Sequence, residues 1–472
     1  MISNSIPQEI LEAVNRKFGF ALLIKGVAGT GKTTLALEIL KLAKNPFYIS
    51  TRVSPEFLYA QFPWIQEFLP PSNIYNATQA YFPTIIAPQE KNFQTLNYDN
   101  VSNFIEMLVD NFQQVEEPTI VIDSWNAVTG YKNLEDNEIE KFTNLIMELV
   151  RKLNMKLIFV TEKPEISFLD YIADGVIINH DLRIEDRRVR VMELLKLRSI
   201  RINQPTYTYT LEAGRFKSFP AYKFQFPSIL INPEPILDPN NDFISTGISD
   251  LDAFFEGGLK KSCFNLLEIA HSVGEGFLNF IIPLFTNHLN LGRSIIAILP
   301  EGYSAHNFNN LLQHFVDKNQ FLKQMIYFDR LSEDPKEEEI KPYIQPLEIN
   351  IQTTFKNIWE NAERLRDQNN DYILYFLALD KLGNMYQEHE ILRELSDHIA
   401  HIKGNIGDLT VAFMREGQAL INNVSHMAYR HWKIRLINKA MVIYGIQPES
   451  EFQLVNNDIS KGYVTLELTP LV

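Results

Sequence analysis

The stretch Gly26-Val27-Ala28-Gly29-Thr30-Gly31-Lys32-Thr33 decides the fold of the N-terminal half of the chain. It has the form G-x-x-x-x-G-K-[ST], which carries meaning only with a strand before it and a helix after it. Both are predicted here, because residues 20–25 (FALLIK) are typical of a buried strand and residues 33–43 (TTLALEILKLA) have a helical period. The sequence therefore predicts a phosphate-binding loop between a strand and a helix.

The residue types of this loop indicate its ligand. Glycines let the backbone curl so that successive N–H groups face the phosphates, and the helix beginning near Lys32 adds the positive end of its dipole. We expect Lys32 to reach the β- and γ-phosphates and Thr33 to place its hydroxyl on Mg2+. The expected ligand is ATP with Mg2+, although these residues do not separate ATP from GTP. The predicted nucleotide-binding residues are Gly26, Val27, Ala28, Gly29, Thr30, Gly31, Lys32, Thr33 and Thr34.

Two further strand ends supply candidate partners for the metal and for the attacking water. Asp123 ends the apolar run 119–123 (TIVID), where a carboxylate can hold a magnesium-bound water, although an aspartate after a strand can equally cap a helix. Thr161 and Glu162 end the run 157–161 (LIFVT) and would face the same crevice, where α/β sheets bind ligands. The catalytic candidates are thus Lys32, Asp123 and Glu162, and the metal candidates are Thr33 and Asp123.

The first half of the chain alternates between short apolar runs and amphipathic stretches. Further strands are predicted at 47–50, 119–123 and 157–161, and a helix is predicted at 138–153, which indicates an α/β fold with a mainly parallel sheet. Residues 176–179, 188–198 and 207–212 follow one another closely and predict antiparallel strands at one edge. Four prolines in 226–242 indicate an extended linker.

The second half repeats this order of elements. Strands are predicted at 264–269, 294–299, 372–379 and 409–414, helices at 355–366 and 389–402, and a solvated acidic loop at 332–341. We therefore predict two tandem α/β domains, residues 1–225 and 243–472, joined by the linker 226–242. Residues 270–277 (AHSVGEGF) stand where a second phosphate loop belongs, but the lysine and threonine are missing and Glu275 brings a negative charge. Asp380 is a candidate relic of the metal-binding aspartate, and the second domain is predicted not to bind nucleotide.

The composition of the chain limits which classes of partner are expected. The 472 residues carry a net charge of -14, so nucleic acid is not the default partner, although a local basic patch can outweigh the total. A single cysteine, Cys263, excludes an internal disulfide and fits a reducing cytoplasm. No run of about 18 apolar residues occurs, so no membrane span is expected.

Taken together, these residues resemble the RecA/RadA-like ATPases, most closely the KaiC-like branch. Residues 245–259 (STGISDLDAFFEGGL) resemble the segment that opens its domains, and 187–198 (RRVRVMELLKLR) resemble the basic segment that follows its ATPase core. The single intact loop, the segment 50–54 (STRVS) and the basic stretch are also similar to the gas-vesicle regulator GvpD and its archaeal relatives. The resemblance implies two RecA-like P-loop domains, of which the second is degenerate.

The resemblance also implies assembly. In KaiC-like hexamers, residues at the positions of Lys196 and Arg198 reach the neighbouring subunit's nucleotide, so a homo-oligomer is expected. Because alternate residues of a strand share a face, we predict that Arg188, Arg190, Lys196 and Arg198 point the same way from the sheet edge. This basic stretch, residues 187–201, could bind a phosphate in trans, a nucleic acid or an acidic partner protein. It could equally be a solvated edge strand.

One departure from the KaiC-like pattern bears on activity. That branch carries paired glutamates after the second strand, one of which orients the attacking water, whereas Arg52 and Val53 stand there in this chain. Hydrolysis should therefore be slow, with Glu162 as the available substitute. Two functions stay open: a regulatory ATP-binding switch of the KaiC/GvpD type, and a RadA-like ATPase acting on DNA. The acidic charge and the eroded second site favour the switch, and a salt titration of DNA binding would discriminate them.

Overall fold

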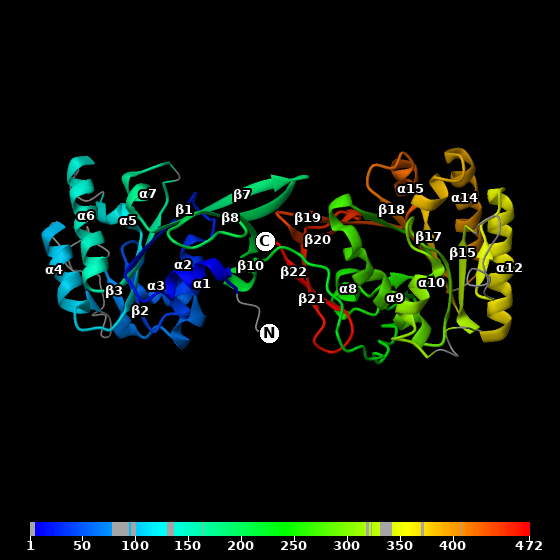
Figure 1. The fold of residues 1–472 in the computed structure, drawn as a ribbon, viewed down its shortest axis with the longest axis horizontal. Coiled ribbons are helices and arrows are strands. Elements are labelled where there is room, and N and C mark those ends of the chain that lie inside the picture. Colours follow the sequence, from blue (N-terminus) through cyan, green and yellow to red (C-terminus); the bar gives the residue numbers. More distant parts are fainter. Residues whose placement is uncertain are drawn as a thin grey trace. The chain divides into compact units, whose positions relative to one another are not determined.

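The computed structural model describes residues 5–77, 94–95, 101–129, 136–163, 165–317, 321, 323–330, 342–369, 372–405 and 407–472. Its contacts divide the chain into two compact units, Met1–Ala221 with Pro470–Val472, and Tyr222–Thr469 (Figure 1). We call them the N-terminal and the C-terminal unit. The predicted acidic loop at 332–341 lies outside the described residues. Among the helices described, none is long and apolar enough to cross a membrane.

The N-terminal unit is built on one mixed sheet in the order β10-β9-β8-β7-β1-β6-β5-β2-β3-β4. The strands β7, β1, β6, β5, β2, β3 and β4 are parallel, each paired with the next. On the other side of β7, the strands β8, β9 and β10 continue the sheet, and each is antiparallel to its neighbour. The strand bounds are β1 Phe20–Gly26, β2 Asn45–Ser50, β3 Ile74–Asn76, β4 Gln94–Thr95, β5 Pro118–Asp123, β6 Lys156–Thr161, β7 Gly175–Ile184, β8 Arg187–Leu197, β9 Thr206–Thr210 and β10 Lys217–Phe219.

Helices cover both faces of this sheet because its central strands are apolar on both sides (Figure 1). One hydrophobic core joins the sheet to α1 (Gln8–Val14), α2 (Lys32–Lys41) and α3 (Pro55–Gln61). A second core, on the opposite face, joins it to α4 (Val101–Phe112), α5 (Trp125–Thr129), α6 (Asp136–Lys152) and α7 (Phe168–Ile172). The carboxyl ends of β1, β5, β6 and β2 therefore meet at one edge of a three-layer α/β sandwich.

The C-terminal unit repeats this sheet strand for strand. Its order is β16-β15-β14-β17-β18-β13-β19-β20-β21-β22, which makes β13 the counterpart of β1, β18 of β6, β17 of β5 and β14 of β2. The strands are β11 Phe243–Ile244, β12 Leu259–Lys260, β13 Phe264–Ile269, β14 Ser294–Ile298, β15 Met325–Asp329, β16 Ile344–Pro346, β17 Ile373–Ala378, β18 Leu409–Arg415, β19 Arg430–Ile437, β20 Ala440–Gln447, β21 Gln453–Asp458 and β22 Thr465–Pro470. The helices are α8 Ser249–Phe254, α9 Leu278–Asn290, α10 Ala305–Leu312, α12 Ile351–Asn369, α13 Leu379–Gly383, α14 Glu388–Gly404 and α15 Ile421–Met427.

The predicted fold class, two tandem RecA-like α/β domains, is confirmed by these two sheets. The position of the basic strand, in contrast, was predicted wrongly. β8 lies between β7 and β9 and not at the edge, which is formed by β10. The proline-rich segment 226–242 has no helix or strand of its own, and it packs within the C-terminal unit, where the Ile236 backbone bonds the Asn287 side chain.

Candidate nucleotide-binding site

The phosphate-binding loop runs from the end of β1 to the start of α2, as predicted. Two of its glycines are required by the backbone. Gly26 has φ +151° and a side chain there would lie 2.3 Å from the Asn179 carbonyl oxygen, and Gly31 has φ +73° and faces the Leu211 side chain at 2.6 Å. Because other residues rarely adopt such angles and have no room here, the loop can curl tightly only with glycine at these positions.

Three side chains from the antiparallel extension hold the loop from outside. Arg190 donates to the Gly29 carbonyl at 2.9 Å. Asn179 and Tyr209 both donate to the Thr30 carbonyl, at 3.0 and 2.6 Å. Buried carbonyl groups need such partners, and satisfying them on this side leaves the loop N–H groups for a ligand.

The predicted metal pair is assembled. The Thr33 hydroxyl donates to Oδ2 of Asp123 at 2.6 Å, and the buried Tyr48 hydroxyl donates to the same oxygen at 2.8 Å. Burial raises the pKa of Asp123, and the two hydrogen bonds partly oppose that shift. A hydroxyl and a carboxylate oxygen are ligands that suit Mg2+, which usually takes few protein groups and completes its shell with phosphate oxygens and water. The residues present therefore fit this metal.

The Lys32 side chain is folded back onto the loop, and it would have to leave this contact to reach a phosphate. Its ammonium group donates to the Val27 carbonyl at 2.8 Å, and Thr30 donates to the same carbonyl at 2.8 Å. Burial lowers the pKa of Lys32, against the charges of Glu162 and Asp123. Thr34, the last residue of the predicted set, is buried in the first turn of α2.

Arg52 and Glu162 form an ion pair at this edge of the sheet, between the residues that follow β2 and β6. Both side chains are partly exposed, and the hydrogen bond from Arg52 lowers the pKa of Glu162. The neighbouring Thr161 hydroxyl and the Glu162 backbone both bond the Asn126 side chain, which fixes the end of β6. Arg52 and Glu162, both singled out from the sequence, thus lie together, and each is the ion-pair partner of the other.

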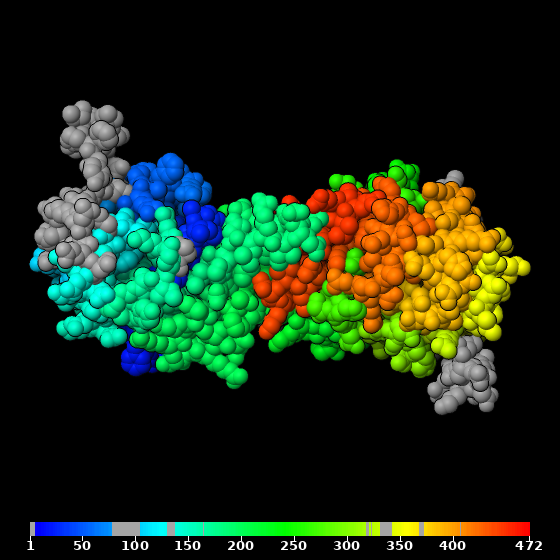
Figure 2. All heavy atoms as spheres, turned by 90° about the horizontal axis from the view of Figure 1, so that it is seen from above, coloured from blue at the N-terminus to red at the C-terminus, as the bar shows by residue number. Residues whose placement is uncertain are grey.

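Three of the four basic residues, Arg188, Arg190 and Lys196, lie in β8 and Arg198 follows it; they do not share one face, and that prediction was wrong. A β-bulge places Leu194 opposite Ile177 but Lys196 opposite Val176, so the alternation of sides reverses between Arg190 and Lys196. In Figure 2 the residues of the β7–β8 hairpin, drawn in blue-green, form part of the surface of the N-terminal unit.

Each of these basic side chains also has a local partner. Arg190 is only 6% exposed and donates to Gly29 and to the Val472 carbonyl, which makes it a brace of the loop. Arg188 pairs with Asp181 at 2.6 Å. Lys196 donates to the carbonyl oxygens of Asp170 and Tyr171, and Arg198 pairs with Asp174 at 3.1 Å.

In the C-terminal unit the same strand–loop–helix position is filled by apolar side chains. Matching Gly29-Thr30-Gly31 with Gly274-Glu275-Gly276 puts Phe277 in place of Lys32 and Leu278 in place of Thr33. Phe277 is 2% exposed, and its ring contacts those of Tyr303 and Phe413 at centroid distances of 5.4 and 5.0 Å. A packed phenylalanine thus replaces the cation that would bind phosphate.

The strand register gives the metal-binding aspartate a counterpart. Ile24 lies opposite Val160, which lies opposite Asp123. In the C-terminal unit Ile269 lies opposite Arg415, and Asp380 is at the level of Arg415, two residues beyond the Ala378–Phe413 pair. The Arg415 guanidinium is 3.5 Å from the Asp380 carboxylate, which is buried and has a pKa raised by that burial. An arginine therefore stands beside this aspartate where the N-terminal unit has a valine.

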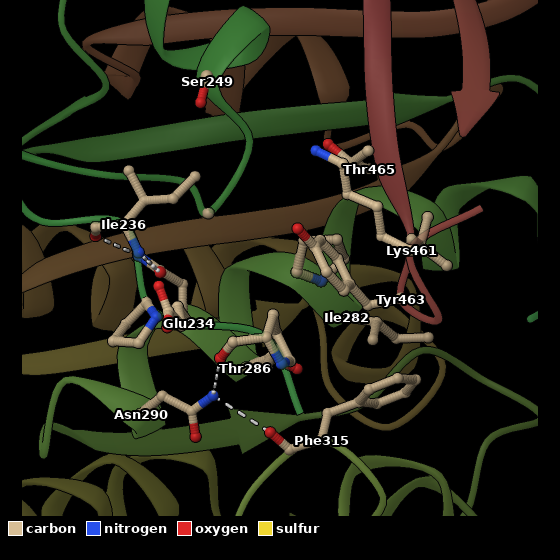
Figure 3. Close-up of a pocket in the computed structure, with 16 residues that line it drawn as sticks. Glu234, Ile236, Ser249, Ile282, Thr286, Asn290, Phe315, Lys461, Tyr463 and Thr465 are labelled. Atoms are coloured by element: carbon tan, nitrogen blue, oxygen red, sulfur yellow. Dashed lines mark hydrogen bonds between the residues drawn. The ribbon is translucent and has the colours of Figure 1, made fainter. Parts of the chain in front are cut away.

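The C-terminal unit has a cavity of about 130 Å3 elsewhere, at the last turns of α9 (Figure 3). Asn290 and Phe315 lie on one side of it, and Lys461 and Tyr463 on another. A cavity of about 150 Å3 holds a molecule of the size of benzene, far smaller than a nucleoside triphosphate. This cavity is therefore too small to hold a nucleoside triphosphate.

Sequence reasoning missed four residues of the N-terminal site, Tyr48, Asn126, Asn179 and Tyr209. Tyr48 and Asn179 carried a usable signal, since Tyr48 lies near the end of β2, which flanks β5, and Asn179 lies in β7 opposite Gly26, the last residue of β1. Tyr209 and Asn126 gave none, because their positions depend on the antiparallel extension and on the turn of α5.

A glycine-rich loop between β1 and α2, with a threonine and a strand-end aspartate in contact, is the arrangement of a P-loop in a RecA-like fold. Comparison with known proteins agrees. The model of the family described as GvpD gas vesicle protein, P-loop domain, matches residues 11–198. Protein GvpD2 of Halobacterium salinarum is 24% identical over 99% of this chain and 96% of its own length, and Protein GvpD1 of the same organism is 22% identical over the same shares.

The circadian clock oscillator protein KaiC 1 of Synechocystis sp. is 22% identical over 55% of this chain and 50% of its own length. The chain is thus similar to GvpD proteins along nearly its whole length and to KaiC proteins over about half of it, and its two sheets have the RecA-like order. The resemblance given by the motifs is confirmed.

Proposed function

We propose that this protein is a regulatory ATP-binding switch that takes one ATP with Mg2+ per chain, in the N-terminal unit. The observation that carries the proposal is the contrast between the two loops. One holds Lys32 and a Thr33–Asp123 contact at 2.6 Å, and the other holds Phe277 packed against aromatic rings. Similarity to GvpD proteins over the full chain supports a regulator, and the cytoplasm is its expected compartment.

Hydrolysis is slow in this proposal. Arg52 and Val53 occupy the place where a glutamate would orient water, and the one carboxylate beside the loop, Glu162, is held in an ion pair. The turnover number should therefore lie well below the median enzyme value of about 10 per second. Phosphate release from purified protein in the steady state measures it, and a value at or above that median would contradict the proposal.

Nucleotide state would then control assembly or the binding of a protein partner. The candidates for a contact with a neighbouring subunit or an acidic protein are the exposed Arg188 and Arg198 and the partly buried Lys196, although all three have partners within their own unit. A homo-oligomer that forms with a non-hydrolysable ATP analogue and dissociates without it would support the proposal. If the wild-type protein sediments as a monomer in both conditions, these basic residues do not contact the nucleotide of a neighbouring subunit.

The direct test is the stoichiometry of binding. Titration of the full chain with a fluorescent ATP analogue in Mg2+ should saturate at one nucleotide per chain. Competition of ATP and of GTP against this analogue compares the affinities for adenine and guanine nucleotides. Two nucleotides per chain, or none, would contradict the assignment.

A further inference from the structure

The Arg52–Glu162 pair occupies the place where hydrolysis would be catalysed. It lies at the carboxyl edge of the sheet, one strand end on either side of the Asp123 strand end, and both charges act on Lys32. No other residue pair in the described site joins a strand-end carboxylate to an arginine. The pair therefore lies beside Lys32, the residue that is expected to contact the γ-phosphate of bound ATP.

We infer that Arg52 is a positioning residue that holds Glu162 away from the attacking water, and that this ion pair is the built-in brake on hydrolysis. The inference rests on the proposed binding of ATP at Lys32. It assigns Glu162 the role of the general base once the brake is removed, and it explains why a glutamate at the end of β6 does not make this chain a fast ATPase.

The chemistry follows from the atoms involved. In hydrolysis, a water oxygen bonds to the γ-phosphorus while the bond from that phosphorus to the bridging oxygen breaks, ADP leaves with the bridging oxygen, and the water's proton goes to a base. A carboxylate that accepts a hydrogen bond from a guanidinium has one oxygen engaged and a lowered basicity, and the lowered pKa of Glu162 has this origin. Arg52 thus restrains both the orientation and the proton affinity of Glu162.

Because both side chains are partly exposed, the ion pair between Arg52 and Glu162 can be broken without unfolding the unit. Each is a little more than two-fifths exposed, so the pair is screened by water and does not hold the fold together. A partner or a neighbouring subunit that presents a carboxylate to Arg52 would free Glu162. Regulation would then act on the hydrolysis step without any change at Lys32 or Asp123.

The experiment is a set of variants of the full chain measured in single turnover with excess protein over ATP and Mg2+. Arg52→Ala should raise the rate of hydrolysis at least about tenfold, because a freed general base contributes about 100-fold or more. The double change Arg52→Ala with Glu162→Gln should lose that gain. Arg52→Lys, which keeps the charge but not the planar fork, should lie between wild type and Arg52→Ala. Arg151→Ala, a change of an exposed arginine in α6, is the matched control.

The same variants are titrated with the ATP analogue, which separates this inference from the proposed function. The gain should appear in the single-turnover rate constant at saturating protein, with the dissociation constant of the ATP analogue little changed. A wild-type chain that binds no ATP would contradict the proposed function, whereas normal binding with no gain in Arg52→Ala would overturn the brake alone. The brake would also be overturned if the gain survived Glu162→Gln, or if Arg52→Lys were as fast as Arg52→Ala. Weaker binding of ATP by Arg52→Ala without faster hydrolysis would overturn it too, and would indicate that Arg52 is a phosphate ligand.

Discussion

The two halves of this molecule share one sheet order but differ in what fills the same loop. In the N-terminal unit the loop ends in Lys32 and Thr33, with polar groups that a phosphate and a metal can use. In the C-terminal unit Phe277 and Leu278 stand in those places and are buried among apolar side chains. The difference shows that a fold of this kind does not need its ligand, provided that apolar packing stabilises the space which the phosphates would occupy.

The aspartates sharpen this comparison. Asp123 is in contact with hydroxyl groups, which can turn to a metal ion, whereas Asp380 lies beside the fixed positive charge of Arg415. Desolvation raises the pKa of both carboxyls, although Asp380 is buried and Asp123 is partly exposed. A binding site thus keeps its aspartate available, and its degenerate copy neutralises the same residue internally.

The largest expected effect tests the packing of the degenerate loop. Phe277→Ala should destabilise the C-terminal unit by about 3–5 kcal/mol, since it leaves a cavity between Tyr303 and Phe413. Urea unfolding of the full chain, followed by hydrogen exchange of peptides from that unit, measures it. Phe18→Ala is the control, because Phe18 is 80% exposed. A loss under about 1 kcal/mol would show that the ring is not part of the core.

Lys32→Ala should give the next largest effect, on binding and not on stability. Removal of one partner of a hydrogen-bonded charge pair should weaken the binding of ATP about 100-fold. Lys41→Ala, at the far end of the same helix, serves as the matched control and should bind normally. If Lys32→Ala retains wild-type affinity, the N-terminal loop is not the site, and the contrast between the two units loses its functional meaning.

The sequence predicted the site's chemistry better than its geometry. The loop, Thr33 and Asp123 could be assigned because strand, turn and helix are local signals, and the order of both domains followed from alternating apolar runs. The shared face of the β8 arginine and lysine side chains could not be predicted correctly, because a β-bulge at Leu195 inserts one residue and reverses the alternation. The burial of Arg190 against Gly29 depends on a contact between residues 161 positions apart, which no local pattern contains.

A pair of asparagine variants gives a smaller effect that differs between the units. Asp123→Asn should lower the Mg2+-dependent part of ATP affinity about tenfold or more, since changing a residue that supports a bound metal ion typically costs about 10–100-fold in affinity. Asp380→Asn should leave ATP affinity unchanged, because Arg415 and not a metal lies beside it. Titrations with and without Mg2+ measure both. Equal losses in the two variants would mean that the C-terminal unit takes part in binding the metal.

The smallest effect is a dependence on pH that arises from Asp123. Burial raises its pKa above the ordinary value of about 3.9, and Mg2+ needs the ionised carboxylate, so ATP affinity in Mg2+ should fall as the pH drops from neutral toward that raised pKa. The effect on stability has the opposite sign. The folded carboxyl binds its proton more readily than the unfolded one, so its contribution to the free energy of unfolding grows as the pH falls through the raised pKa and levels off below about 3.9. Subtracting the profiles of Asp123→Asn from those of the wild type isolates both effects, because asparagine does not titrate. A flat difference profile would show that Asp123 stays ionised over the whole range, and affinity that rises with acid would show that its carboxylate does not bind the metal.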